Sequence, residues 1–412
     1  MPSHPPIRVA TIGAAFSANK GAASMLQAVL EQMETRFGTI EANILTTYPE
    51  ADTRERLRAA GNIIPAKPWQ LVFPMLPLAL LMACLRAVRL PWQWLALNPA
   101  LRALTKADVV LDLAGISFVD GRGFPILVYN TLMTGIPVLV GAKVIKCSQA
   151  LGPFNKPLTR LAARLVLPRL AAVCARGHQT YEHLRHIPGV KAVEAADLAF
   201  LMQVPEDAKR EALELTRAIG ADYVALAPSA VVRNYCQRIG LDYPRLVVET
   251  VDKLTAAGLK VVLFPHSYKE NEPESRMNDG PLCREIHSQL AQPDSCLLLD
   301  RSLPPSVLRA IIQRSQVLVT SRFHAMISAL STEVPVIVMG WSHKYAEVMS
   351  EFGLEEFVYQ YSALDSEHLS QSIFRILADR DVVAAKIRTQ LPNTKRSAMR
   401  NVDVVERVVS GA

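Results

Sequence analysis

The sequence lacks several patterns that mark whole classes of protein. Its six cysteines include no Cys-x-x-Cys pair and no metal-ligand spacing, which argues against a zinc module and against a disulfide framework. They predict reduced, mostly buried thiols in a cytoplasmic protein without a metal site. The start, MPSHPPIRVATIG, has no charged segment followed by an apolar one, so we expect no secretory signal. The chain also has no block of lysine and arginine, no internal repeat and no low-complexity tract, and we expect no nucleic-acid partner.

The composition is that of a globular protein long enough for two domains. Of the 412 residues, 50% are hydrophobic and 20% are charged. Lysine and arginine total 45 against 38 aspartate and glutamate, which gives a formal net charge of +7. This excess favours anionic substrates or a membrane surface, and a generally basic, solvated exterior explains it equally well.

One stretch of the chain has almost no charge. Residues 68–85, PWQLVFPMLPLALLMACL, carry none, and Arg86 and Arg89 follow. Its length approaches that of a transmembrane span, but we expect a glutamine and two internal prolines to break the span. Tryptophan beside arginine is typical of a peripheral contact, so we expect residues 68–97 to touch the inner face of the cytoplasmic membrane. A buried helix or a protein interface is the alternative.

The first half of the chain alternates short apolar runs with helical patterns. After the first run, apolar residues recur at helical spacing: Met25, Leu26, Val29, Leu30 and Met33. The predicted strands are residues 7–13, 108–113, 136–142 and 171–176. Strands that alternate with helices predict a parallel sheet.

The same rhythm restarts after a polar helical stretch at residues 207–220, which indicates a second domain. The predicted strands of this domain are residues 223–229, 260–266, 295–300, 317–322 and 334–340. Each apolar run stops at a polar or flexible group, namely Ser229, His266, Asp300, Ser321 with Arg322, and Gly340 before His343 and Lys344. Ligands of open parallel sheets bind outside the carboxyl ends of the strands, so we expect these residues to share one edge.

These patterns predict an α/β fold of two Rossmann-like domains that face a cleft, as in the GT-B class. We place the N-terminal domain at residues 1–205 and the C-terminal domain at residues 206–412. The tail NVDVVERVVSGA is predicted to be helical and to pack back across the cleft.

Arg322 and His324 are the most informative pair. They are two residues apart at the end of a predicted strand, so their side chains point the same way if the chain is extended there. Arginine holds a carboxylate or phosphate with two parallel hydrogen bonds, and histidine passes a proton near neutral pH. The alternative is an arginine in a salt bridge and a hydrogen-bonded histidine at a helix start. Lys344, after the next strand, is either a second anion contact or a solvated lysine.

Three further candidates lie in the first half. Ser17 and Asn19 belong to a loop of small residues, GAAFSANKGAASML, which permits close approach of a ligand or forms a tight turn with a helix cap. The loop matches neither Gly-x-Gly-x-x-Gly nor the P-loop pattern, so it does not specify a nucleotide. Arg176, at a predicted strand end, either contacts the ligand or is a surface cation.

In this order the segments resemble those of the polysaccharide pyruvyl transferase family. The most specific match is SRFHAMISALSTEVPVIVMGWSHKY, residues 321–345, which is similar to the family's Arg-x-His, helix, Val-Pro strand and Lys-Tyr pattern. Weaker matches are NKGAASML, SQALGPF, ARGHQTYEHL, ADLAFLM, and FPHSYKENEP with MND after it. Together they span most of the chain in the family's order.

The resemblance implies transfer of the carboxyethylidene group of phosphoenolpyruvate, a co-substrate, onto two hydroxyls of a saccharide, with release of phosphate. It implies no cofactor. On this resemblance His324 is the general acid and base, and Arg322 stabilises the departing phosphate. Arg176 and Lys344 then bind the donor anion. The remaining substrate-binding candidates are His266, Ser321, Asn19 and Ser17.

The resemblance also leaves alternatives open. Residues 1–205 would hold the acceptor and residues 206–412 the donor, but Ala22 follows Gly21 where the family often has an acidic residue, and the acceptor sugar stays open. A lipid-linked saccharide would fit the apolar stretch 68–97. Two other functions are a GT-B glycosyltransferase that uses a nucleotide sugar and a catalytically silent scaffold for glycan assembly.

Overall fold

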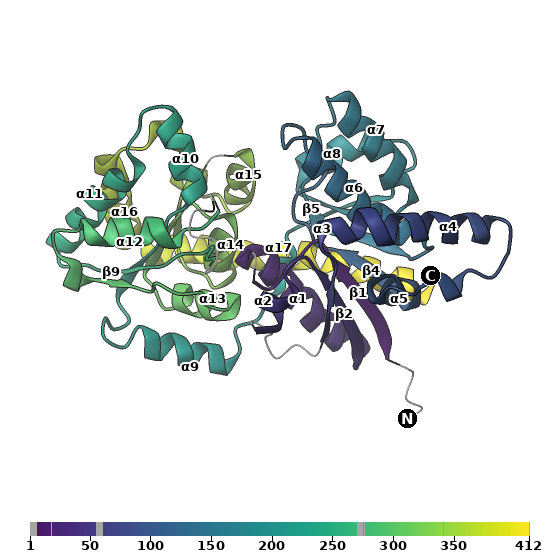
Figure 1. Cartoon of the computed structure of the whole chain (residues 1–412). Helices are drawn as coiled ribbons and strands as arrows, with labels where there is room; N and C mark the ends of the chain where they lie inside the picture. The colour runs from purple at the N-terminus through teal and green to yellow at the C-terminus, as the bar shows by residue number, and fades with distance from the viewer. Residues whose placement is uncertain are drawn as a thin grey trace. The chain divides into compact units, whose positions relative to one another are not determined.

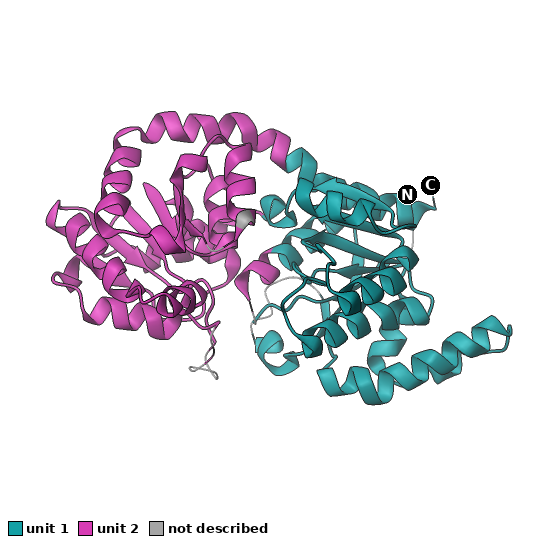
Figure 2. Cartoon of the chain, turned by 90° about the horizontal axis from the view of Figure 1, so that it is seen from above, with its two compact units in different colours: residues 1–17, 25–202, 395–412 teal, residues 18–24, 203–394 magenta. Residues whose placement is uncertain are grey.

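The computed structural model describes residues 6–17, 19–54, 61–269, 275, 277–340 and 342–411. It divides into two compact units, coloured separately in Figure 2. Unit 1 comprises Met1–Ser17, Met25–Met202 and Lys395–Ala412, and unit 2 comprises Ala18–Ser24 and Gln203–Thr394. The division at Met202 lies close to the boundary that we placed at residue 205. The tail from Lys395, however, groups with the N-terminal half, and residues 18–24 group with the C-terminal half.

Unit 1 is built around seven parallel strands in the order β3-β2-β1-β4-β5-β6-β7 (Figure 1). The strands are β1 (Ile7–Ile12), β2 (Ile40–Thr46), β3 (Gly61–Pro65), β4 (Val109–Asp112), β5 (Val144–Gln149), β6 (Ala172–Arg176) and β7 (Ala192–Ala195). Strands β4 and β6 are buried along their whole length. Burial on both faces explains why such strands form short apolar runs in the sequence.

The helices of unit 1 cover its sheet. They are the larger part of α1 (Lys20–Phe37), then α2 (Pro49–Arg54), α3 (Pro68–Gln70), α4 (Leu76–Ala87), α5 (Pro99–Lys106), α6 (Phe124–Leu139), α7 (Pro157–Val166), α8 (His178–Arg185) and the end of α17 (Arg380–Ser410). The five residues of α1 that we singled out for their helical spacing are at most 2% exposed, which confirms the predicted buried face. All six cysteines are free thiols and five of them are buried, as the sequence predicted.

The predicted strand at residues 136–142 is wrong. Helix α6 continues to Leu139, and the strand begins at Val144 after a turn in which Gly141 has a φ of +88°. A short apolar run does not by itself distinguish a strand from the end of a buried helix. In this case the run extends an apolar helical pattern that starts at Phe124.

The prolines of the apolar stretch do not break it. Residues 68–87 form one helical run, in which α3 passes into a π-helical turn, η1 (Leu71–Met75), and then into α4. Pro74 lies within the wide turn and Pro77 lies at the start of α4, so neither removes a hydrogen bond from the middle of a regular helix. The run is long and apolar enough to cross a membrane by length and composition.

Unit 2 contains six parallel strands in the order β10-β9-β8-β11-β12-β13. The strands are β8 (Tyr223–Ala227), β9 (Lys260–Leu263), β10 (Cys296–Leu298), β11 (Val317–Thr320), β12 (Val336–Gly340) and β13 (Val358–Gln360). The helices are α9 (Glu206–Leu215), α10 (Ala230–Arg238), α11 (Tyr243–Ala256), α12 (Gly280–Ser288), α13 (Pro305–Gln313), α14 (Phe323–Ser331), α15 (His343–Glu351), α16 (Ser366–Ala378) and the first part of α17. All five strands predicted for this half are confirmed, and β13 adds an edge strand.

Candidate active site

The loops that follow the strands of unit 2 meet at one edge of its sheet, because all of its strands are parallel. Ser229, His266 and Ser321 follow β8, β9 and β11, and each is at most 3% exposed. Asp300 follows the outermost strand, β10, where it is exposed and pairs with Arg284 at 2.8 Å. The buried polar groups of this edge therefore gather around the inner strands.

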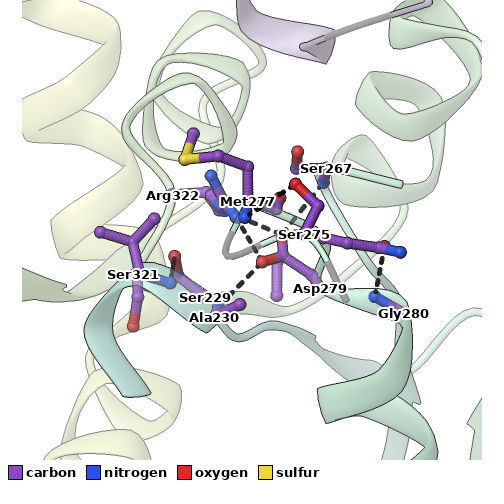
Figure 3. A network of polar contacts seen from close by, with 12 residues as sticks. Ser229, Ala230, Ser267, Ser275, Met277, Asp279, Gly280, Ser321 and Arg322 are labelled. Carbon is purple, nitrogen blue, oxygen red and sulfur yellow. Dashed lines mark hydrogen bonds and ion pairs between the residues drawn. The ribbon is translucent and has the colours of Figure 1, made fainter. Parts of the chain in front are cut away.

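Arg322 is fixed by a buried carboxylate. Its guanidinium donates from Nε to Oδ2 of Asp279 at 2.8 Å and from Nη2 to Oδ1 of the same side chain. Nη2 also donates to the backbone oxygen of Met277 at 3.1 Å (Figure 3). The side chain of Arg322 is 12% exposed and that of Asp279 is 0% exposed. Nη1 is the guanidinium nitrogen that none of these three bonds uses.

Asp279 joins three strand ends through this carboxylate. Oδ1 accepts from the backbone nitrogen of Ala230 at 2.9 Å, and Oδ2 accepts from that of Ser267 at 3.0 Å (Figure 3). Burial raises the pKa of Asp279, and Arg322 opposes that rise. Since every contact is a donor, the ionised carboxylate is the form that these bonds satisfy. Asp279 therefore ties the loops after β8 and β9 to Arg322 after β11.

Arg322 and His324 do not lie on one extended segment, which corrects the argument from spacing. Strand β11 ends at Thr320 and α14 begins at Phe323, so Arg322 is the residue before the helix and His324 lies in its first turn. What fixes the imidazole is the first loop of the chain. A Cβ atom built on Gly21 would lie 2.0 Å from Nδ1 of His324, so the ring lies against the backbone of Gly21. Only glycine leaves room for that approach.

Basic groups surround the second histidine of the site. His266 is 3% exposed, and its burial lowers its pKa well below the usual value. His324, Arg322, Lys20 and Arg309 lower that pKa further through their charges. Lys20 and Arg309 are each 1% exposed. This edge of unit 2 therefore gathers four basic groups, with Asp279 as the buried partner of Arg322, in a region from which water is largely excluded, and such a set of basic groups favours the binding of anions.

Lys344 reaches the same region through aromatic rings. Its ammonium nitrogen lies 4.8 Å from the ring centre of Phe323, and that ring meets the imidazole of His324 edge-on at 5.3 Å. The hydroxyl of Tyr345 donates to the backbone oxygen of Ser321 at 3.0 Å, and the Ser321 hydroxyl bonds to Tyr243. Ser321 therefore holds the loop in place through these two hydrogen bonds. The side chain of His343 lies outside the described residues.

The other predicted candidates have local partners. Asn19 belongs to unit 2, and its side chain accepts from the backbone nitrogen of Gly21 at 2.9 Å, which is the helix-cap alternative. Ser17 belongs to unit 1 and donates from its backbone nitrogen and its hydroxyl to Asp52.

Arg176, at the end of β6 in unit 1, pairs with Asp197 at 2.9 Å and is 7% exposed, so it is not a surface cation. The structure thus brings Arg322, His324, His266, Lys344, Ser321 and Asn19 together in unit 2.

Sequence reasoning missed three buried charges of this site: Asp279, Lys20 and Arg309. Asp279 and Lys20 lie in the MND and NKGAASML segments, where they were quoted without a role.

Sequence reasoning also missed a network in unit 1, where Lys146 donates to Asp112 at 2.5 Å and to Thr134 at 3.0 Å. A lysine inside a buried strand was the signal for that network. Within the part of the chain that the structure describes, no cluster of metal-ligating side chains occurs.

Comparisons with known proteins give a family and a fold. The sequence matches the model of the family described as polysaccharide pyruvyl transferase over residues 19–343. A search of curated protein sequences gives no significant match.

Among solved structures, the UDP-GlcNAc 2-epimerase from Neisseria meningitidis bound to UDP-GlcNAc has a TM-score of 0.62 at 12% identity, covering 97% of this chain and 99% of that chain. A glycosyltransferase from Rickettsia africae ESF-5 has a TM-score of 0.58 at 12% identity, covering 99% and 100%. A trehalose-phosphate synthase from Burkholderia vietnamiensis has a TM-score of 0.55 at 14% identity, covering 99% and 100%. At these identities the likeness shows the fold alone, which is GT-B-like.

Proposed function

Because the chain belongs to the polysaccharide pyruvyl transferase family, an enzyme family, we propose that its unit 2 binds phosphoenolpyruvate and transfers the carboxyethylidene group to a saccharide. The observation that carries this proposal is the set of buried basic groups around His266. Phosphoenolpyruvate carries a carboxylate and a phosphate on neighbouring atoms, so it requires several fixed cations within a few ångströms. Lys20, Arg309 and Arg322 are cations of this kind. Because they are largely shielded from water, each attracts an anion more strongly than a solvated cation would.

Arg322 and Lys344 have different parts in this proposal. Asp279 takes up one side of the Arg322 guanidinium and holds it in one orientation, so Nη1 is presented to the ligand without a further loss of side-chain freedom. Lys344 is held over Phe323 by a cation–π contact, and we propose that it neutralises the second anionic group of the donor. Both positive charges then stabilise the negative charge that develops on the phosphate as its bond to C2 breaks.

His324 carries the proton in this proposal. Its imidazole donates a proton to the methylene carbon of phosphoenolpyruvate, which makes C2 electrophilic. The first saccharide hydroxyl attacks C2, and the imidazole takes its proton back from that hydroxyl. The second hydroxyl then replaces phosphate at C2, and its proton leaves with the phosphate. Contact with Gly21 and the edge of Phe323 holds the ring in one orientation during both proton transfers.

The proposal also covers the acceptor and Arg176. We propose that unit 1 supplies the saccharide side. Arg176, held by Asp197, keeps the role that the resemblance implies, a contact to the donor anion, as a prediction. The acceptor is a saccharide of a polysaccharide or of a lipid-linked precursor, since the family implies a saccharide acceptor.

A ligand panel tests the donor site without requiring the acceptor. A ligand that binds the folded state raises the midpoint of thermal unfolding. We expect phosphoenolpyruvate to raise the midpoint of the native chain, and UDP-GlcNAc to leave it unchanged. The Lys344→Gln variant should lose most of that response, because it removes a cation that we propose to contact the donor. Arg210→Gln on the exposed side of α9 is the matched control and should respond like the native chain. A response to UDP-GlcNAc alone would make the protein a user of nucleotide sugars and would end this proposal.

A further inference from the structure

Unit 1 exposes a large set of apolar side chains on three of its helices. On the helical run of residues 68–87, Trp69 is 57% exposed and Phe73 is 72% exposed. On α7, three leucines at helical spacing are 53–58% exposed. The apolar face consists of Trp69, Val72, Phe73, Leu80, Leu81, Phe124, Ile126, Leu158, Leu161 and Leu165. Single exposed apolar side chains are ordinary, whereas a contiguous group marks an interaction surface.

The three helices cover the same face of the seven-stranded sheet. Their inward residues join one core cluster with Ile12 of β1 and Val173 of β6. Those inward residues are Met75, Met82, Met133, Ile136, Ala163 and Val166. Helix α6 contacts both α4 and α7, so the three helices lie side by side (Figure 1). Their outward sides therefore point away from the sheet together, and the exposed residues form one surface.

The charges near this surface are mostly positive. The sequence has no aspartate or glutamate from residue 68 to residue 106, a stretch with basic residues Arg86, Arg89, Arg102 and Lys106. On α7, Arg160 and Arg164 are exposed beside the leucines. From residue 113 to residue 170 the single acidic residue is Asp120, whose carboxylate accepts from two backbone nitrogens. Glu50, which pairs with Lys67 at 3.1 Å, is a further acidic neighbour at the start of the run. An apolar surface bordered mainly by basic residues is complementary to a layer of anionic headgroups.

We propose that the apolar face binds the surface of an anionic lipid bilayer. Trp69 and Phe73 enter the interfacial region together with the leucines of α7, and the flanking arginines contact lipid phosphates. The proposal extends the contact beyond residues 68–97, because α6 and α7 contribute half of the apolar residues. It does not depend on the transfer reaction, so its failure would leave the proposed function intact.

The helical run of residues 68–87 lies on the bilayer and does not cross it. Leu71, Met75, Ala79 and Met82 are at most 1% exposed and belong to the core of unit 1. Insertion across a bilayer would remove all four from that core and expose the sheet beneath them. Trp69 and Arg86, near the two ends of the run, are residue types that favour the interface.

Partition of the full chain into vesicles tests the proposal. The probes are vesicles of phosphatidylcholine alone and of phosphatidylcholine with about one third phosphatidylglycerol. We expect the native chain to bind the anionic vesicles. The Phe73→Asp/Leu161→Asp variant should bind them at least about tenfold more weakly, since two interfacial anchors become charged. Arg160→Gln/Arg164→Gln should weaken binding to anionic vesicles by about fivefold per residue and leave binding to neutral vesicles unchanged.

The matched control carries the same charge change on unit 2. Leu213 and Val382 are 49% and 62% exposed, so Leu213→Asp/Val382→Asp should bind anionic vesicles as the native chain does. Far-ultraviolet circular dichroism checks that all three double variants are folded. Equal partition of Phe73→Asp/Leu161→Asp and Leu213→Asp/Val382→Asp, or no partition of the native chain, would overturn the proposal. A native dimer that becomes monomeric only in Phe73→Asp/Leu161→Asp, without vesicle binding, would assign the apolar face to a second copy of the chain and overturn it too.

Discussion

The imidazole of His324 lies directly on the backbone of Gly21, so that a Cβ atom at position 21 would sit 2.0 Å from Nδ1. The two residues are far apart in the sequence, yet one fixes the other. The first turn of α1 forms one wall for the proposed acid and base of the reaction, and this is a physical reason for glycine at that position.

Replacement of Gly21 by alanine should displace the ring. We expect Gly21→Ala to lower phosphoenolpyruvate-dependent turnover by about tenfold or more, because the proton donor moves out of line. Gly135→Ala is the control, since Gly135 lies in helix α6 with nothing within 4 Å of an added Cβ. A double-mutant cycle with His324→Ala should give a coupling free energy of unfolding of about 0.5–3 kcal/mol. Additive effects in that cycle would show that the two residues do not constrain each other.

Loss of the Asp279 charge should destabilise the fold strongly. Asp279→Asn leaves the buried Arg322 guanidinium without its carboxylate, which costs about 3–5 kcal/mol in the free energy of unfolding. Arg284→Ala breaks the exposed pair with Asp300 and should cost about 0–1 kcal/mol. Urea unfolding of both variants provides the comparison, and similar costs would contradict the assignment of Asp279 as the residue that joins three strand ends.

The neutral state of His266 predicts a pH dependence of stability. Burial and the nearby charges of His324, Arg322, Lys20 and Arg309 lower its pKa well below the usual value of 6.5 in the folded chain. The unfolded chain therefore binds the proton first as the pH falls. The contribution of His266 is complete above about pH 6.5 and is lost progressively below it.

Urea unfolding between about pH 5 and pH 8 measures this loss. The free energy of unfolding of His266→Asn should fall less between the upper and lower ends of that range than the free energy of unfolding of the native chain. His368→Asn on the exposed side of α16 is the control and should retain the native slope. A native slope in His266→Asn would mean that the imidazole is not held neutral.

Strands that form apolar runs were predictable from the sequence, including the edge strand β10, and strands that mix polar and apolar residues were not. The predicted strands β8, with YVALA, and β11, with VLVT, are largely apolar and buried along their whole length. The missed strands β2, β3, β5, β7 and β13 mix polar and apolar residues, as in AVEA of the edge strand β7 and VIKCSQ of the central strand β5. The placement of the tail also required the structure, since the chain returns to unit 1 only after Lys395.

The candidate site was predictable where its residues follow strand ends. Ser229, His266 and Ser321 gather at one edge because parallel strands impose it. Asp279 and Lys20 could not be placed in the same way, because each lies on a loop or at a helix start far from Arg322 in sequence. Their approach depends on packing that no local pattern records.

Calorimetric titration of phosphoenolpyruvate into the full chain tests the central claim most directly. We expect saturable binding by the native chain, binding within about twofold for Arg210→Gln, and binding at least about tenfold weaker for Lys344→Gln, because a fixed cation near the ligand is lost. The affinity of the native chain should also fall as salt rises. Absence of binding by the native chain, or an affinity that Lys344→Gln leaves unchanged, would contradict the assignment of this edge of unit 2 as the phosphoenolpyruvate site.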